Sequence, residues 1–249
     1  MKYALRFRTE TPLQLPVNYN KILQAAILNW LQNQEATDFL HDVGYEHHHR
    51  KYKLYTFSDI RGEYRYLEKI RRIEYLDEFY IFLSFYSDDY EWIVNDNVKN
   101  KKPIVFGTNV VPLIDAMVAD EVYQSCIVDT ASPITVHSTF EKQDGRKITH
   151  YYEPTEKGFS EMVRNNLIRK YVSYHGVEPE SADFSIKPYN RKKLRRIDTS
   201  YNRIVIRAWR GSYEIDGSPE LIKMALLAGI GERNAIGFGC VLQRKSSVG

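Results

Sequence analysis

Cysteine is nearly absent from this sequence, whose 249 residues contain only Cys126 and Cys240. Two thiols cannot form a disulfide framework or a four-thiolate zinc site, so a disulfide-rich secreted scaffold is excluded and a reducing cytoplasm is expected. Long hydrophobic runs are also lacking, because no apolar stretch approaches the ~20 residues that a membrane helix needs. The opening MKYALRFRTE does not resemble a signal peptide. We therefore expect no membrane partner.

The remaining composition is that of an ordinary globular protein, with 43% hydrophobic and 27% charged residues. These values exclude a disordered chain, a collagen and a coiled coil, and the length leaves room for one large domain or two small ones. Tyrosine is abundant, with 19 residues against three tryptophans. Tyrosine rings fill cores, and exposed ones stack on unpaired bases.

Charges of opposite sign gather in different segments. Residues 74–97 hold seven acidic side chains and no lysine or arginine, whereas residues 187–210 hold nine basic side chains and one acid. Such a run forms either a solvated face or a surface for a polyanion. Tyr189, Tyr201 and Trp209 are interleaved with the cations, a mixture typical of phosphate contacts combined with base stacking. The candidate contacts are Arg191, Lys192, Lys193, Arg195 and Arg196.

Hydrophobic periodicity predicts the order strand, helix, strand, strand, helix, strand in the first half. Tyr3, Leu5 and Phe7 share one face of the first strand, residues 2–8. A helix over residues 22–31 has Asn18 or Asn20 as its expected N-cap, and a short helical turn ends at Gly44. The other elements span residues 52–60, 79–85, 88–98 (capped by Asp88 or Asp89) and 103–113.

The same order repeats in the second half. Its clearest helix spans residues 156–176 and ends at Gly176, and a second helix begins at Ser218-Pro219, with proline at the first helical position. Strands are expected over residues 125–138, 184–190, 203–209 and 238–245. Two βαββαβ units predict an α+β fold of two tandem ferredoxin-like domains, which we place at residues 1–119 and 120–249.

A glycine-rich segment, residues 229–239, lies between the last helix and the last strand. It is not a dinucleotide fingerprint, because Asn234 stands where the third glycine belongs, and it is not a Walker A loop. Two interpretations stay open. The loop either brings backbone N–H groups close to an anion, with Arg233 and Asn234 at its tip, or it is a tight turn with close strand–helix packing.

The stretch RAWRGSYEIDGSPELIKMALLAGIGERNAIGFGCV resembles the C-terminal signature of the CRISPR-associated repeat-processing endoribonucleases, the Cas6 family of the RAMP superfamily. That signature ends in a G-h-G-x-x-x-x-x-G-h-G loop, with h apolar, which Gly229, Gly231, Gly237 and Gly239 match. The blocks Phe39-Leu40-His41-Asp42, Lys53-Leu54-Tyr55-Thr56-Phe57-Ser58, Ser132-Pro133-Ile134 and Phe159…Asn166-Leu167…Lys170-Tyr171 agree in order.

The resemblance implies tandem ferredoxin-like domains and metal-free cleavage of CRISPR precursor RNA within each repeat, which yields guide RNAs. The implied partner is repeat RNA, before and after cleavage, and not DNA. Other interference-complex subunits and a second copy of the chain stay open as partners. A non-catalytic RNA-binding RAMP subunit is the alternative. A small-molecule-binding protein of this fold is disfavoured by the basic segment.

Metal-free RNA cleavage needs groups that move protons and a cation that stabilises the phosphorane. Histidine suits proton transfer, since its ordinary pKa is about 6.5. His41 occupies the position of the family's catalytic histidine, near a helix C-terminus, and Lys53 that of its charge-stabilising lysine. From the residues alone, the alternative is a surface or helix-capping histidine for His41 and a solvated edge-strand lysine for Lys53.

One position departs from the family. Some members carry a catalytic tyrosine on the first helix, one turn after a leucine–glutamine pair, and here that position is Leu28. The local candidates for a second proton-transfer group are His47, His48 and His49.

The run His47–His48–His49–Arg50–Lys51 is not expected to hold a metal, because adjacent side chains diverge and no Cys or Asp cluster supports a site. We expect it to form a cationic loop near an RNA phosphate, with Arg50 and Lys51 adding charge. No metal and no cofactor are predicted.

Overall fold

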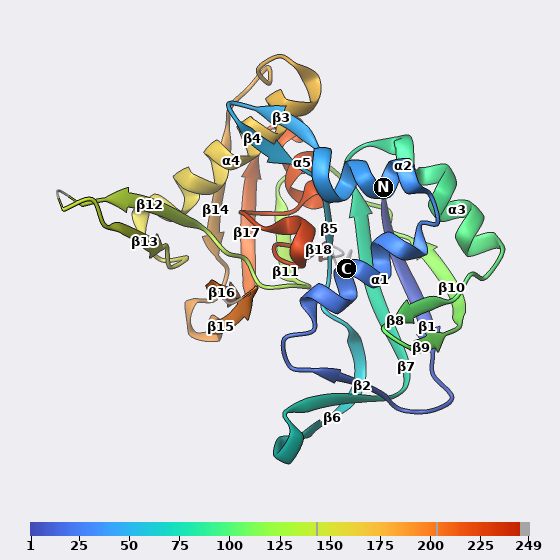
Figure 1. The fold of residues 1–249 in the computed structure, drawn as a ribbon. Helices are drawn as coiled ribbons and strands as arrows, with labels where there is room; N and C mark the ends of the chain where they lie inside the picture. Colours follow the sequence, from blue (N-terminus) through green and yellow to red (C-terminus); the bar gives the residue numbers. More distant parts are fainter. Residues whose placement is uncertain (143, 203, 245–249) are drawn as a thin grey trace, which may run out of the picture.

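The computed structural model describes residues 1–142, 144–202 and 204–244. Two antiparallel sheets lie side by side, one from each half of the chain, with helices packed against them (Figure 1). Within the described residues, no helix is both long and apolar enough to cross a membrane.

The first half forms a ferredoxin-like unit. In its sheet β1 lies between β10 and β7, and β5 pairs with the C-terminal part of β7, so the four strands take the order 4-1-3-2. β2 (Leu13–Pro16) and β6 (Arg61–Leu67) extend the N-terminal part of β7. The unit's elements are β1 (Lys2–Arg8), α1 (Asn20–Trp30), β5 (Tyr55–Phe57), β7 (Arg72–Phe85), α3 (Glu91–Lys99) and β10 (Leu113–Val118).

The second half repeats this topology with the order β14-β17-β11-β18, again 4-1-3-2. The tandem ferredoxin-like fold is thereby confirmed. Its elements are β11 (Cys126–Thr130), α4 (Lys157–His175), β14 (Phe184–Pro188), β17 (Ser212–Gly217), α5 (Pro219–Ala228) and β18 (Val241–Gln243). The boundary between residues 119 and 120 stays a prediction.

Shorter elements connect these units. The hairpin β12–β13 projects away from the body, as Figure 1 shows. The shorter strands are β3 (Tyr45–His47), β4 (Arg50–Tyr52), β8 (Ile104–Phe106), β9 (Asn109–Val111), β12 (His137–Glu141), β13 (Lys147–Tyr151), β15 (Arg195–Tyr201) and β16 (Ile204–Arg210). The shorter helical elements are α2 (Gln34–Asp38), a π-helical turn (Phe39–Val43), and 3₁₀ turns at Glu68–Ile70, Asp88–Tyr90, Arg191–Lys193 and Asn234–Ile236.

The two units share an extensive contact. Tyr3, Leu5 and Phe7 are buried in the first core, as the alternation predicts. The opposite face of β1 is also covered: Lys2 is 1% exposed, and its Nζ donates to Val241 O at 2.8 Å and contacts Glu121. The sheet of the first unit is therefore covered on both faces near β1.

Two segments predicted as strands of the main sheets lie outside those sheets. Residues 103–113 form the small hairpin β8–β9, and the fourth strand of the first sheet is β10. Residues 204–210 form β16, which pairs with β15 outside the main sheet, and β17 is the third strand. Ile204 and Val205 are exposed, whereas Tyr213 and Ile215 are buried. Alternation identifies a strand, but burial against neighbours decides which sheet it joins.

The predicted helix caps are only partly correct. Ser218 caps α5, and Gly44 and Gly176 adopt positive φ at helix ends. Tyr19 takes the N-cap position of α1 instead of Asn18 or Asn20, and Ser87 caps the turn before α3 instead of Asp88 or Asp89. The displaced asparagines serve tertiary contacts: Asn20 donates to Ile236 O at 3.0 Å, and Asn18 to Ser200 at 3.1 Å.

Candidate functional site

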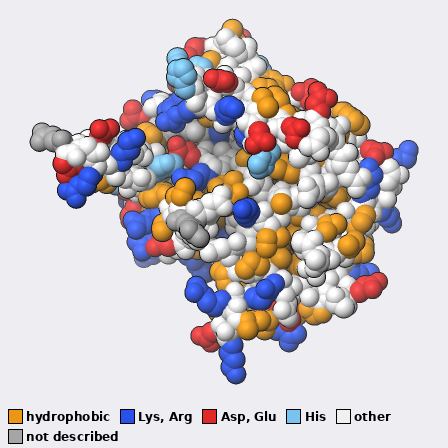
Figure 2. Space-filling view, viewed as in Figure 1, with side chains coloured by type: hydrophobic (Ala, Val, Ile, Leu, Met, Phe, Trp, Pro, Cys, Tyr) orange, Lys and Arg blue, Asp and Glu red, His pale blue; other side chains and the backbone are white. Residues whose placement is uncertain are grey.

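A cavity of about 580 Å³ lies between the two units, under the glycine-rich segment, and we call it the glycine-loop cavity. Figure 2 shows this face hollowed below the β3–β4 hairpin, with Lys and Arg side chains near the hollow. Both units and the β15–β16 hairpin contribute to the lining, which includes Arg50, Lys51, Tyr52, Lys53, Leu54, Tyr55, Asn166, Lys170, Tyr201, Asn202, Ile204 and residues 231–236.

The lining of this cavity is strongly cationic. Among the described residues, five basic side chains contribute to it, against one acid, Glu232, which contacts His137 of β12. A concave wall of one charge sign concentrates the field and attracts an anion. The basic residues are Arg50, Lys51, Lys53, Lys170 and Arg233.

Lys53 follows β4 and reaches the cavity over Gly44. A Cβ at Gly44 would lie 2.8 Å from Lys53 Cδ and 2.7 Å from Tyr52 O, so only glycine permits this passage. Lys53 Nζ is buried without a hydrogen-bond partner among the described residues. Burial lowers the pKa of Lys53 to about 8, and the charge of Lys51 adds to the lowering. A lysine with these properties can place positive charge on a phosphate.

His41 lies on the π-helical turn that precedes Gly44. Its side chain is 57% exposed, and Nδ1 lies 2.8 Å from Asp42 Oδ1. Lys51 Nζ donates to Asp42 O at 3.2 Å, which joins this turn to the β3–β4 hairpin. Engagement of Nδ1 by a carboxylate leaves Nε2 for proton transfer.

The three other candidate histidines, His47, His48 and His49, lie at the turn of the β3–β4 hairpin. His48 and His49 have φ of 46° and 60° and are exposed, and His47 is half-buried with its ring 4.1 Å from that of His48. None of the three lines the glycine-loop cavity, whereas the next two residues, Arg50 and Lys51, do. No group of three His, Cys, Asp or Glu side chains in the described part of the chain is placed to hold a metal ion.

The glycine-rich segment is packed internally. Gly229, Gly231, Gly237 and Gly239 all have positive φ, and a Cβ at Gly231 would lie 2.5 Å from Thr135 O. Gly237 N donates to Asn234 O and Gly239 N to Pro133 O, so these two amides are occupied.

The expectation that Asn234 lies at the tip of this segment is wrong. Its side chain is buried and donates to Ile230 O at 3.3 Å and Phe238 O at 3.0 Å. Arg233 has φ of 60° and is half-buried against the cavity.

Lys170 of α4 is hydrogen-bonded to the glycine-rich segment. It is not among the site residues predicted from the sequence. Its Nζ donates to Gly229 O at 2.7 Å, Gly231 O at 3.0 Å and Asn234 Oδ1 at 2.7 Å. Burial lowers the pKa of Lys170 to about 7, and the negative charge of Glu232 opposes this lowering. The available signal was a lysine three residues after Leu167, on the apolar face of the helix.

The basic segment reaches the cavity only at one end. Arg191, Lys192, Lys193, Arg195 and Arg196 are exposed and do not line the cavity, which the hairpin touches through Tyr201, Asn202 and Ile204. Trp209 is 5% exposed and belongs to the interior, so its expected stacking role is wrong. Tyr189 is exposed, and the Arg244 guanidinium lies 5.2 Å from its ring.

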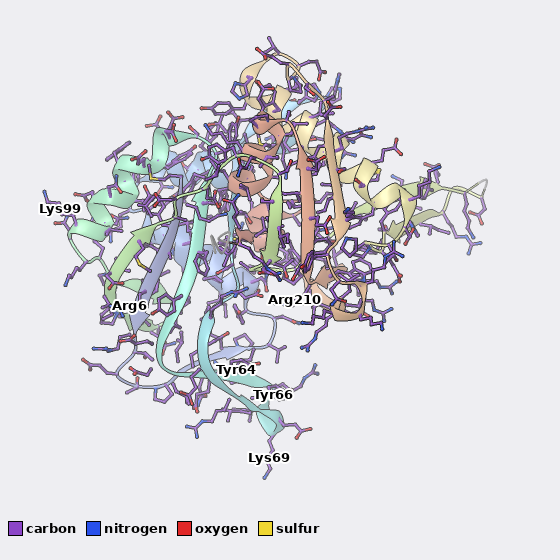
Figure 3. The ribbon with its side chains drawn as sticks, turned by 180° about the vertical axis from the view of Figure 1, so that it is seen from behind. Arg6, Tyr64, Tyr66, Lys69, Lys99 and Arg210 are labelled. Atoms are coloured by element: carbon purple, nitrogen blue, oxygen red, sulfur yellow. The ribbon has the colours of Figure 1, made fainter. Side chains whose placement is uncertain are left out.

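A second cavity of similar size, about 580 Å³, opens on the face of the molecule seen in Figure 3, and we call it the rear groove. Figure 3 shows Arg210 at the junction of the units and Tyr64 and Tyr66 on β6 below it. Arg210 forms an ion pair with Asp59 in this groove, and Arg61 donates to Thr130 O at 2.8 Å. Its charged groups are thus paired.

Comparison with known proteins agrees with this fold. The sequence model of the family described as CRISPR associated protein Cas6, C-terminal, matches residues 117–242. The chain is 26% identical over 257 residues to CRISPR-associated endoribonuclease Cas6 1 of Methanocaldococcus jannaschii, and the match covers 97% of this chain and 92% of that protein.

Two solved structures share the fold. One, described as a Cas6-related gene product from Pyrococcus furiosus, has a TM-score of 0.81 at 21% identity and covers 99% of both chains. The other, described as an RAMP protein binding different RNA substrates, has a TM-score of 0.78 at 21% identity and covers 98% of this chain and 100% of its own. The fold is therefore that of a protein with two tandem ferredoxin-like units. Within that class, this chain belongs to the Cas6 family.

Proposed function

We propose that this protein is a metal-independent endoribonuclease that cleaves CRISPR precursor RNA within the repeat. The 2′-hydroxyl attacks the adjacent phosphorus and the 5′-oxygen leaves, which yields a 2′,3′-cyclic phosphate, a 5′-hydroxyl and mature guide RNAs. Family membership and a relative named as a Cas6 endoribonuclease support this substrate and reaction class. The solved neighbour named for its RNA substrates supports RNA as the ligand.

The observation that carries the chemistry is Lys53, a buried amine without a partner among the described residues, in a cationic cavity. In the proposed reaction Lys53 stabilises the charge of the phosphorane, and His41 takes the 2′ proton or delivers a proton to the 5′-oxygen. Asp42 orients the imidazole of His41. A histidine of the β3–β4 turn is the candidate for the second proton transfer.

The test uses 5′-labelled repeat RNA from the source organism's CRISPR array, in excess EDTA, with wild-type protein and His41→Ala. We expect one cut within the repeat, a cyclic-phosphate end, and a rate reduced by about 10²–10⁴-fold in the variant. His150→Ala is the matched control, since His150 pairs with Glu156 at the β12–β13 hairpin. An unaffected rate would instead assign the chemistry to His47, His48 and His49.

The second candidate is a non-catalytic RNA-binding RAMP subunit. It is favoured by Leu28, which is 3% exposed and packs in the core of the first unit, where it cannot transfer a proton. Tight binding of repeat RNA with no cleavage by the wild type would support this alternative. Both candidates place the protein in the cytoplasm with repeat RNA as its partner.

A further inference from the structure

The glycine-loop cavity contains polar atoms that nothing in the described chain satisfies. Four residues of its lining each carry one buried atom without a hydrogen-bond partner among the described residues: Tyr52 Oη, Lys53 Nζ, Asn166 Oδ1 and Arg233 Nε. Asn166 is 7% exposed and Tyr52 is 8% exposed. Leaving a buried polar group unpaired costs about 1–3 kcal/mol. Four such groups around one cavity indicate a place for a polar ligand.

Asn166 Oδ1 lacks a hydrogen-bond partner among the described residues, whereas the polar group of Lys170 on the same helix has several. Lys170, one turn later on α4, has three acceptors within 3.0 Å. Val163 and Leu167 on either side of Asn166 are fully buried, so the backbone that carries the amide is held by packing. The asparagine is thus a rigidly placed polar group whose Oδ1 has no hydrogen-bond partner among the described residues.

The chemistry of the lining describes that partner. Lys53 and Arg233 require an anion, and Asn166 Oδ1 requires a hydrogen-bond donor. A volume of about 580 Å³ falls in the usual range for small-ligand sites, about 300–1,000 Å³. A nucleotide combines a phosphate with a base edge that carries donors and acceptors. An asparagine amide pairs best with adenine, by accepting from N6 and donating to N7.

We propose that the glycine-loop cavity holds one unpaired nucleotide of the RNA, next to the phosphate at Lys53, and that Asn166 reads its base, which we expect to be adenine. This inference rests on the proposed function, because it takes the RNA that Lys53 acts on as the ligand. Asn166 is assigned to recognition of the base, and Lys53 and Arg233 to the phosphate.

In the first test, the nucleotide before the cut and the nucleotide after it are randomised in repeat RNA, and the cleaved fraction is sequenced. The wild type should prefer adenine at one of these positions by about tenfold, and Asn166→Ala should reduce the preference there to less than about threefold. Asn165→Ala is the matched control, because Asn165 is the preceding residue of α4 and does not line the cavity. The same preference in wild type and Asn166→Ala would overturn the proposal.

A second test does not depend on cleavage. Calorimetric titrations compare adenosine, uridine and ribose 5′-monophosphates on the intact protein. We expect AMP to bind more tightly than UMP or ribose 5-phosphate, a difference that Asn166→Ala removes and Asn165→Ala keeps. Equal binding of all three phosphates would show a phosphate site without base recognition and would overturn the proposal. Selective AMP binding by a protein that cuts no RNA would contradict the nuclease function and leave the base pocket supported.

Discussion

The glycine-loop cavity and the rear groove are similar in volume and lie between the same two units, but their charges are arranged differently. In the rear groove Arg210 is paired with Asp59, and Arg61 with a backbone carbonyl. In the glycine-loop cavity Lys53 Nζ and Arg233 Nε have no partner within the described residues. Paired charges at an interface fix orientation, whereas unpaired buried charges are retained where a ligand completes them. The first arrangement joins the units, and the second leaves buried charges that the proposed ligand would complete.

The largest expected effect concerns Lys170, which lines the glycine-loop cavity and donates hydrogen bonds to the glycine-rich segment. Lys170→Met removes the donor for three oxygens and should lower the free energy of unfolding by about 3 kcal/mol, because buried acceptors lose their partner. RNA cleavage should fall as the loop loosens. Urea unfolding measures the first effect, with Lys157→Met, an exposed position of the same helix, as control. An unchanged urea midpoint would show that the loop holds itself.

The pH dependence of stability sharpens the same test. The pKa of Lys170 is about 7 in the folded protein and 10.5 ordinarily. Between these values the unfolded chain binds more protons than the folded one, so this group makes stability rise with pH across that window. Lys170→Met should flatten the rise, and a slope identical to wild type would contradict the assignment.

The next largest effect is a loss of cleavage activity, which we expect from substitution of Lys53 in the glycine-loop cavity and not from substitutions in the rear groove. Lys53→Ala should reduce the cleavage rate by about 100-fold, the usual loss for one group that stabilises transition-state charge. Because the pKa of Lys53 is about 8 and the charged amine is the active form, kcat/KM should fall as pH rises above that value. Lys53→Arg should retain activity to higher pH. Lys69→Ala is the control, because Lys69 lies at the lower tip of the molecule, between β6 and β7, and does not line the cavity (Figure 3).

A smaller effect is expected from the exposed basic segment outside both cavities. Replacing Arg195 and Arg196 together with alanine should lower RNA affinity by about tenfold and reduce the slope of log Kd against log salt by about 0.7 for each phosphate that the variant no longer neutralises. Lys99→Ala with Lys101→Ala, next to the acidic segment, should change neither. Filter binding at several salt concentrations gives both values. An unchanged slope would make the segment a solvated face.

The smallest effect on activity is expected in the rear groove. Arg210→Met and Asp59→Asn, alone and together, should show a coupling of about 1 kcal/mol in unfolding free energy, with cleavage rates within about twofold of wild type. Thermal unfolding and the cleavage assay measure the two properties. A loss of cleavage comparable to that of Lys53→Ala would mean that the rear groove also binds substrate.

Much of the fold was predictable because local patterns carry it. Three such patterns predict elements that the structure contains. They are the alternation of Tyr3, Leu5 and Phe7 in β1, the apolar face of α4, and Ser218-Pro219 at the start of α5. The errors concerned both elements and partners: the strands β10 and β17 were not predicted, and several correctly predicted segments have other partners than expected. β16 has a strand pattern yet pairs outside the sheet, and Asn18 and Asn20 contact the second unit instead of capping α1.

The amino-acid sequence predicts the tandem fold, the family resemblance, and His41 and Lys53 as candidate site residues. The three-dimensional structure alone shows which groups surround the cavity, because these groups, such as Tyr52, Asn166 and Arg233, come from positions far apart in the chain. It also decided that Asn234 faces inward and that Lys170 holds the glycine loop. Burial and hydrogen bonding depend on neighbours in space, and periodicity along a chain does not specify those neighbours.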